Sequence, residues 1–235
     1  MKNACSIIWF KRDLRVFDHA PLAAAVEAGL PILPLYVIEP GYWQQPFASR
    51  RHWHFIHDSL VELRTDCAEL GQPLVVRTGT ITNVFESIQH DYVIDAIYAH
   101  EETSNLWGYQ RDKDVRQWCR AHDIKCNEYP TNGIVRRLRD RDDWAQIRNQ
   151  RMAAPLIPKP DRLRPVSSEV GQILAKNDPL FGGDVPGVTQ QGGRRAAIDT
   201  LHSFLTDRGS QYLFRLSAPG PSEIYCSRLS AHLTW

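Results

Sequence analysis

The sequence predicts an α/β fold, a doubly wound five-stranded parallel sheet of the Rossmann-like kind over residues 1–130. Short apolar runs rich in β-branched and aromatic residues alternate there with amphipathic stretches at helical spacing. The connections between them are short, which favours parallel strands with helices on both faces. This alternation stops at Pro130, so a different organisation is expected beyond it.

The expected strands are the buried-type runs of the first 130 residues. They are residues 7–10, 31–38, 73–77, 96–99 (extended back toward 93) and 124–129. The helices expected between them cover residues 19–28, 49–70, 81–90 and 107–122. Ser49 is a plausible N-cap of the longest helix, and glycines end two of them. Residues 40–47, which contain Gly41, Pro46 and several aromatic residues, are expected to form a loop with exposed aromatic side chains.

Residues 131–190 are predicted to be an interdomain connector that wraps over a surface. Prolines and glycines punctuate this stretch, and only residues 142–152 have a convincing helical pattern. So long a stretch without regular structure is uncommon inside one compact domain. Residues 191–235 should then begin an all-α domain, starting with an amphipathic helix at 192–207. The apolar residues of 223–235 resemble the start of a buried element, so we expect the chain to be truncated.

Charge is distributed unevenly although the net charge is only +1. Residues 134–195 contain 12 Lys and Arg against seven Asp and Glu, whereas residues 1–133 have an excess of acid. The basic middle could face a polyanion such as DNA, or it could be a solvated linker.

The five cysteines are odd in number and have no CxxC or zinc-type spacing. This usage favours reduced thiols in a cytoplasmic protein. No signal peptide precedes Ile7, and no apolar run approaches the roughly 20 residues of a membrane helix.

Several common catalytic motifs are absent. The sequence has no GxGxxG after the first strand, no Walker loop and no GxSxG. His52, His54 and His57 cluster in RRHWHFIH, but no cysteine or carboxylate joins them at ligand spacing. Partly exposed helix histidines are therefore the favoured interpretation, not a metal site.

Dense charge follows the first strand, in KRDLRVFD (residues 11–18). Residues just past the carboxyl end of a parallel strand line the ligand crevice of such a sheet. Glu101 and Glu102 follow the fourth strand in the same way, as an acid/base pair or as groups that bind polar atoms of a ligand. The alternative for the first loop is that its charges pair with each other.

The opening WFKRDLRVFDHAPLAAA resembles the first motif of the DNA photolyase/cryptochrome family nearly position by position. Lys11 stands where Arg is commoner, and His19 where Asn is commoner. HEETSNLWGYQRDKDVRQW (100–118) and GIVRRLRDRDDWA (133–145) are similar to segments of one bacterial branch. A further block, residues 192–220 with CSRLSAHLTW (226–235), resembles the start of that family's FAD-binding helical domain.

The resemblance implies two sets of binding residues. Residues matching the family's flavin-phosphate contacts are Tyr212, Ser227, Arg228, Leu229 and Ser230, with Cys226 in place of the usual Thr. Residues 1–130 would be an antenna domain, which in many relatives holds a folate or a deazaflavin as second chromophore. Its candidate contacts are Arg12, Asp13, Glu101, Glu102 and Asn105; a folate-type Asn-Glu pair is not visible before Arg111-Asp112. Alternatively, Arg12, Asp13 and Arg15 brace the sheet edge.

The resemblance also implies a reaction, the light-driven repair of pyrimidine dimers in damaged DNA by electron transfer from reduced FAD. A cryptochrome-like blue-light photoreceptor is the alternative, and a stand-alone α/β nucleotide-binding module is a third interpretation. In relatives most of the flavin pocket lies beyond the equivalent of Trp235. We therefore expect this chain by itself to hold FAD poorly and to repair no DNA, and we assign it no catalytic residue.

Overall fold

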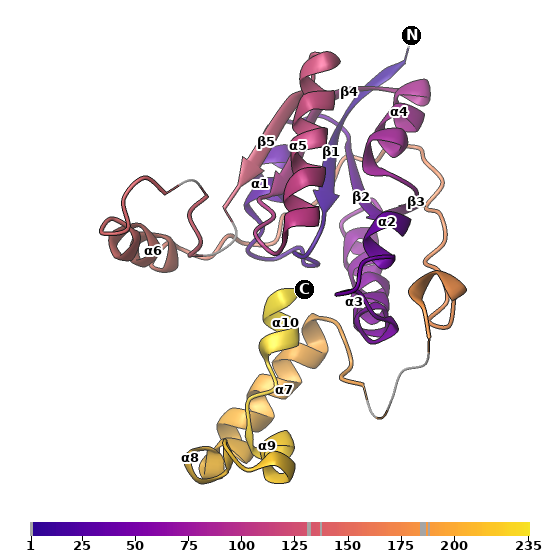
Figure 1. Cartoon of the computed structure of the whole chain (residues 1–235). Coiled ribbons are helices and arrows are strands. Elements are labelled where there is room, and N and C mark those ends of the chain that lie inside the picture. Colours follow the sequence, from indigo (N-terminus) through magenta and orange to yellow (C-terminus); the bar gives the residue numbers. More distant parts are fainter. Residues whose placement is uncertain (1, 131–132, 137, 184–186, 188) are drawn as a thin grey trace.

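A computed structural model describes residues 2–130, 133–136, 138–183, 187 and 189–235. Its centre is a five-stranded, all-parallel sheet in the order β3-β2-β1-β4-β5 (Figure 1). The strands are β1 (Asn3–Phe10), β2 (Ile32–Ile38), β3 (Val75–Thr78), β4 (Tyr92–His100) and β5 (Lys125–Tyr129). The strand order reverses direction at β1, so the predicted doubly wound α/β sheet is confirmed.

Two hydrophobic cores, one on each face of the sheet, hold the layers together. In β1 the side chains alternate between them, with Ile8 and Phe10 in one core and Ile7 and Trp9 in the other. Every residue of β2 is buried. A strand covered on both faces has no solvent-facing positions, which is why these strands read as continuous apolar runs.

Two helices cover each face. The first core includes side chains of α1 (Ala20–Glu27) and α3 (Arg50–Glu69), and the second includes those of α4 (Ile81–Asp91) and α5 (Leu106–Ala121). These bounds agree with the predicted helices to within two residues. No helix in the described part of the chain is both long and apolar enough to cross a membrane.

The expected loop at residues 40–47 differs from the prediction. It begins with a one-turn helix, α2 (Pro40–Trp43), whose first residue is a proline. Trp43 is buried, and its ring contacts those of Trp53 and Phe181 at 5.6 and 4.8 Å between centroids. The expectation of exposed aromatic side chains is therefore wrong for Trp43, because Phe181, distant in sequence, covers it.

The segment after β5 runs along the sheet domain for much of its length. It includes α6 (Trp144–Met152), which lies apart from the sheet in Figure 1, and a short 3₁₀ turn, η1 (Pro179–Phe181). Between these, backbone hydrogen bonds attach it to the strands and helices: Ile32 N to Arg164 O at 2.9 Å and Val76 N to Val170 O at 2.8 Å. Leu163 is fully buried against α3 and its neighbours.

Residues 194–235 form a series of helices beyond the carboxyl edge of the sheet (Figure 1). They are α7 (Arg194–Thr206), η2 (Arg208–Gln211), α8 (Tyr212–Arg215), α9 (Pro219–Tyr225) and α10 (Ser230–Thr234). None of these helices contains a buried residue. The predicted helix at 192–207 is present, but the apolar face expected on it is open, with Leu205 72% exposed.

The start of α7 docks closely on α3. The backbone N–H of Gly193 donates to Ser59 Oγ at 2.9 Å, and that of Arg195 donates to Glu62 Oε1 at 3.0 Å. A Cβ atom at position 192 would lie 1.9 Å from the carbonyl oxygen of Phe55. Only glycine allows the two backbones to approach this closely.

Candidate functional site

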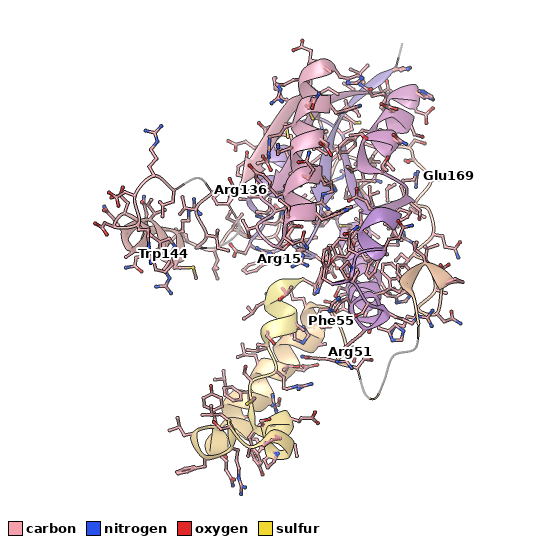
Figure 2. All side chains as sticks on the ribbon, viewed as in Figure 1. Arg15, Arg51, Phe55, Arg136, Trp144 and Glu169 are labelled. Atoms are coloured by element: carbon pink, nitrogen blue, oxygen red, sulfur yellow. The ribbon has the colours of Figure 1, made fainter. Side chains whose placement is uncertain are left out.

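A cavity of about 660 Å³ opens at the carboxyl ends of β1 and β4. Its walls come from the loops after these two strands, from α3, from the segment after β5 through Ile134 and Met152, and from α7 and α10. Figure 2 labels Arg15 and Phe55, two lining residues that lie near the end of α10. Charged or polar lining residues include Arg12, Asp13, His100, Glu101 and Arg194. The cavity occupies the place where parallel sheets bind ligands.

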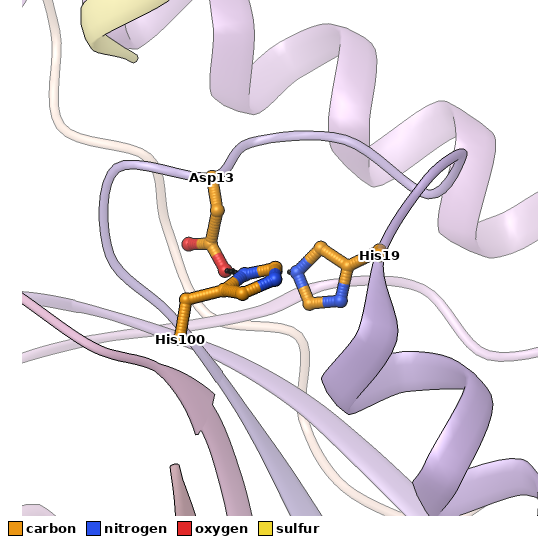
Figure 3. A group of neighbouring side chains, drawn as sticks. All are labelled: Asp13, His19 and His100. Atoms are coloured by element: carbon orange, nitrogen blue, oxygen red, sulfur yellow. Dashed lines mark hydrogen bonds and ion pairs between the residues drawn. The ribbon is translucent and has the colours of Figure 1, made fainter. Parts of the chain in front are cut away.

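Asp13, His19 and His100 form a buried cluster (Figure 3). Two of them, Asp13 and His100, also line the cavity. Asp13 Oδ2 is 2.6 Å from His100 Nδ1 and 2.8 Å from His19 Nε2. The other oxygen, Oδ1, accepts a hydrogen bond from the backbone N–H of Lys11 at 2.7 Å. All three side chains are at most 4% exposed as residues. One carboxylate thus organises two imidazole rings from different parts of the chain.

The helix start at α1 fixes the proton positions in this cluster. His19 is the N-cap, and its Nδ1 accepts a hydrogen bond from the backbone N–H of Leu22 at 3.1 Å. Its proton must then sit on Nε2, which donates to Asp13. Burial lowers the pKa of His19 to about 4, an effect that Asp13 only partly offsets. His19 is therefore neutral at pH 7.

Asp13 is ionised. Burial by itself would raise its pKa, but the hydrogen bonds from His100 and His19 outweigh burial and hold the pKa well below its usual range. Since this carboxylate can only accept, the ring proton that faces it from His100 is on Nδ1.

The cluster offers three potential metal-ligand atoms within 4.8 Å of one another, but its hydrogen bonding does not fit a metal. A metal bound to His19 Nε2 would need the lone pair of that nitrogen and would move the proton to Nδ1. That proton would then face the N–H of Leu22 and break the cap of α1. The cluster is instead a carboxylate that accepts hydrogen bonds from two imidazole rings and one backbone N–H.

Next to the cluster, buried charges from four segments neutralise one another. Lys11 Nζ and Arg136 Nη2 contact Asp112 Oδ2 at 3.1 and 2.9 Å, and Arg111 Nη2 contacts Glu102 Oε2 at 3.5 Å. Burial would raise the pKa of Asp112, but Lys11 and Arg111 lower it to about 2. These charged groups therefore already neutralise one another within the chain, so they are not available to balance the charge of a ligand.

A second cavity, lined by Trp9, Glu39 and Arg111 among others, has a volume of only about 40 Å³. Arg111 fills the space beside it: its guanidinium lies 4.7 Å from the centroid of the Trp9 ring and 3.1 Å from Glu39 Oε2. Pockets that enclose cofactor-sized ligands have volumes of roughly 300–1,000 Å³. Of these two cavities, the one of about 660 Å³ is in that range and the one of about 40 Å³ is not.

The structure brings four of the five antenna candidates to the larger cavity. Arg12 lies over the Trp235 ring at 4.3 Å, Asp13 lies in the cluster, and Glu102 is ion-paired. Glu101 forms no ion pair with any described residue. Asn105 is not a lining residue; its Oδ1 accepts a hydrogen bond from Gly108 N at 2.8 Å and caps α5.

The flavin-loop candidates lie elsewhere, on the helical segment. Arg208 holds the backbone of this loop: Nη1 donates to the carbonyls of Ile224 and Cys226, at 2.8 and 2.6 Å. Arg228 has a left-handed backbone, with φ at +62°, and its carbonyl accepts from Gln190. The loop backbone is thus fixed by partners other than the side chains of Ser227, Arg228 and Ser230, which make no hydrogen bond to the described part of the chain.

The side chains of the loop face outward to different degrees. Arg228 and Ser230 are exposed, and Ser227 and Leu229 are half-buried. Tyr212 packs edge-on against Phe204 at 5.7 Å between ring centroids. None of the five candidates lines the 660 Å³ cavity.

Sequence reasoning missed the histidines of the cluster. It noted His19 only as a departure from a motif, and it gave His100 no role. The signal was available in principle, because β1 and β4 are neighbours and their carboxyl ends meet at one edge. Among the described residues, one group of potential metal ligands lies within 4.8 Å of one another, and it is the cluster around Asp13.

Two curated relatives with different names match the chain. The first is the cryptochrome DASH of Synechocystis sp., 32% identical over 116 residues, which are 47% of this chain and 23% of the relative. The second is the deoxyribodipyrimidine photo-lyase of Agrobacterium fabrum, 29% identical over 117 residues, which are 50% of this chain and 24% of the relative.

A solved structure has the same fold over nearly the whole chain. The archaeal photolyase of Sulfolobus tokodaii, crystallised with two FAD molecules, matches with a TM-score of 0.73 at 22% identity. The match covers 98% of this chain and 51% of that protein, so the chain spans about half its length. The family model for DNA photolyase matches residues 6–154, more than half of the sequence. The chain therefore belongs to the DNA photolyase family.

Proposed function

We propose that this chain is part of a flavin-dependent DNA photolyase that repairs pyrimidine dimers in damaged DNA by light-driven electron transfer from reduced FAD. The observation that supports it most is the loop at residues 226–230. Arg208 and Gln190 fix its backbone, while the side chains of Ser227, Arg228 and Ser230 form no hydrogen bond with any residue that the structure describes. These are the groups that bind phosphates.

The residues of the loop fit the phosphates of FAD with one exception. Ser227 and Ser230 can donate hydroxyl hydrogen bonds, and Arg228 can add a charge-assisted pair of them. Cys226 replaces the threonine of the family motif, so one hydroxyl donor is missing. FAD, when bound, supplies the electron-transfer chemistry, while the chain's own groups anchor and orient it.

We further propose the domain organisation suggested by the sequence: an antenna domain at 1–130, a connector at 131–190 and the start of the FAD-binding domain at 191–235. The antenna proposal places a second chromophore, a folate or a deazaflavin, near Arg12, Asp13, Glu101 and Glu102. The Sulfolobus tokodaii structure, whose second FAD is described as implying a novel light-harvesting cofactor, supports such an arrangement. Asn105 is the weakest candidate, because its side chain is engaged in capping α5.

A cryptochrome-like photoreceptor without repair activity is the second candidate. The observation that favours it is the 32% identity to a cryptochrome DASH. Both candidates need the flavin, so flavin binding does not separate them.

The test is a blue-light repair assay on the full-length product of the gene that encodes this chain. Oligonucleotides with one cyclobutane dimer or one (6-4) photoproduct would be illuminated, and loss of the lesion followed by chromatography. Repair that falls with the flavin content in Arg228→Gln, but not in the exposed control Ser217→Ala, supports a photolyase. A flavin-loaded protein that repairs neither lesion would instead favour the photoreceptor.

A further inference from the structure

We propose that Cys119 and Cys126 form a redox-reactive dithiol site, in which a small peroxide oxidises Cys126 and Cys119 then closes a disulfide with it. Cys119 is buried near the end of α5, and Cys126 is half-buried on β5, the strand at one edge of the sheet. Both are free thiols in the structure. Neither lines the cavities of about 660 and 40 Å³, so this inference is independent of the proposed function.

The packing of α5 against β5 brings the two thiols together. The chain turns back directly after α5, where the backbone N–H of Ile124 donates to the carbonyl of Cys119 at 2.9 Å. One helical turn earlier, Arg116 Nη1 pairs with Glu128 Oε2 at 2.7 Å. Helix residues three apart share a face, and strand residues two apart share a face. Cys119 therefore faces Cys126 beside this ion pair, and both pack in the second core.

The contact between the two sulfur atoms gives them different roles. The thiol of Cys119 donates a hydrogen bond to the sulfur of Cys126. This bond lowers the pKa of Cys126 and outweighs the opposing effect of burial, and the charge of Arg116 acts in the same direction. The same bond, together with burial, raises the pKa of Cys119. Cys126 is thus the thiol that reacts as a thiolate, and Cys119 is the one that resolves the product.

Cys5 and Cys67 lack these features. Both are fully buried in the cores, and burial raises their pKa, to about 11 for Cys5 and about 12 for Cys67. A thiol that stays protonated and out of reach of solvent is inert toward oxidants. Partial exposure, a lowered pKa and an adjacent second thiol coincide at Cys126. These are the features of cysteines that oxidise to disulfides.

The reaction transfers two electrons from the sulfur atoms to the peroxide. The Cys126 thiolate attacks one oxygen of hydrogen peroxide, the O–O bond breaks, and a sulfenic acid and one water are formed. The thiol of Cys119 then attacks the Cys126 sulfur, loses its proton and displaces the sulfenic hydroxyl as a second water. Two thiols and one peroxide thus give one disulfide and two waters. Oxidation of Cys126 also removes the thiolate that held the Cys119 proton in place.

The test is peptide mapping of the 235-residue chain after mild oxidation. The chain is treated with hydrogen peroxide, the remaining thiols are blocked with iodoacetamide under denaturing conditions, and the product is digested with trypsin. Trypsin cleaves after Arg120 and Lys125, so the disulfide joins two separate peptides, residues 117–120 and 126–136. We expect this cross-linked pair, lighter by two hydrogens than the two reduced peptides together, as the main oxidised product. Dithiothreitol should remove it.

Single substitutions separate the roles of the two thiols. In Cys119→Ala, oxidation should stop at a sulfenic acid on Cys126 that dimedone traps. Alkylation of Cys126 in the folded variant should also slow several-fold at pH 7, because its hydrogen-bond donor is lost. In Cys126→Ala, the buried Cys119 should remain a thiol. Cys226→Ala removes another half-buried thiol and is the matched control, with an unchanged yield of the cross-linked peptides.

The natural chain unfolded in urea shows whether the fold or the closeness in sequence brings the thiols together. The folded chain should form the disulfide several-fold faster, and equal rates in the two states would overturn the proposal. A folded chain that gives no cross-link between peptides 117–120 and 126–136, or that pairs Cys126 with Cys226 instead, would overturn it too. These measurements need no variant, so they decide the question even where a substitution prevents folding.

Discussion

The sheet region (residues 2–130) and the helical segment (residues 189–235) stabilise their helices in opposite ways. The four helices that cover the sheet, α1, α3, α4 and α5, pack into two cores, and every residue of β2 between those cores is buried. In the helical segment no helix has a buried residue, and Phe214 is 85% exposed. Packing between layers therefore positions the first region, whereas local backbone bonds position the second.

The partners of the charged groups also differ between the two regions. In the sheet region, buried charges such as Lys11 and Asp112 meet side chains of opposite sign. In the helical segment Arg208 donates to backbone carbonyls, among them those of Thr200 and Cys226. A guanidinium group that donates hydrogen bonds to several backbone carbonyls can hold helices together where no hydrophobic core is present. The sheet region should therefore respond to loss of apolar volume, and the helical segment should not.

The largest expected effect comes from removing the same side chain in both regions. Leu60 in α3 is fully buried, whereas Leu213 in α8 is 79% exposed. Leu60→Ala should lower the free energy of unfolding by about 2–5 kcal/mol, because it leaves a cavity in the first core. Leu213→Ala should change it by less than about 0.5 kcal/mol. Urea unfolding followed by circular dichroism measures both, and similar losses would refute the contrast.

The second prediction concerns the pH dependence that His19 gives to the sheet region. The pKa of His19 is lowered from 6.5 to about 4 in the folded chain, so the unfolded state binds the proton first as pH falls. The stability it contributes is full above pH 6.5 and is lost as pH falls through about 4. The shift corresponds to a loss on the order of 3 kcal/mol.

His19→Asn isolates this contribution, because asparagine is also a good N-cap and does not titrate. Between pH 7 and pH 4 the variant should lose on the order of 3 kcal/mol less stability than the natural chain. Acid-sensitive groups that do not contact His19 contribute to both proteins and cancel in the difference. Asp13 is the exception, because the hydrogen bond from His19 helps to lower its pKa. Parallel curves of unfolding free energy against pH would show that His19 is not the buried neutral group described above.

The contrast between the regions also explains how much of the fold the sequence could predict. Strands and helices of the sheet region were placed to within a few residues, since burial on one or both faces imposes a period on the sequence. The one-turn helix α2 was missed because four residues cannot show a period. Trp43 was expected to be exposed because the ring that covers it, Phe181, belongs to a distant segment.

The sequence predicted which edge of the sheet holds the candidate site, but not which side chains contact one another there. Parallel strands end at one edge, so charged residues after two neighbouring strands were correctly expected to meet. Which side chains pair there depends on register: Asp13 and His100 are brought together by the β1–β4 pairing. Asn105 illustrates a competing signal, because an asparagine just before a helical run is also an N-cap signature.

The third prediction tests the junction between the two regions. Gly192→Ala would place a Cβ atom 1.9 Å from the Phe55 carbonyl oxygen and 2.7 Å from Ser59 Oγ. Relieving this overlap must move α7 away from α3, at a cost of about 1–3 kcal/mol. Gly220→Ala, with open space around the added atom, is the control. Hydrogen exchange at the α7 amides should rise in the first variant only; an unchanged rate would mean that the close approach is dispensable.

The smallest expected effect concerns helix starts. Asn105 Oδ1 accepts from the backbone N–H of Gly108, whereas Ser49, the cap expected for α3, makes no such side-chain bond. Asn105→Ala should therefore cost about 1 kcal/mol, and Ser49→Ala only a few tenths. Helices α7 to α10 likewise lack side-chain caps; α7 instead receives Glu62 from α3. Equal destabilisation of the two variants in thermal unfolding would contradict this difference. It would mean that the Ser49 side chain caps α3 in solution as Asn105 caps α5.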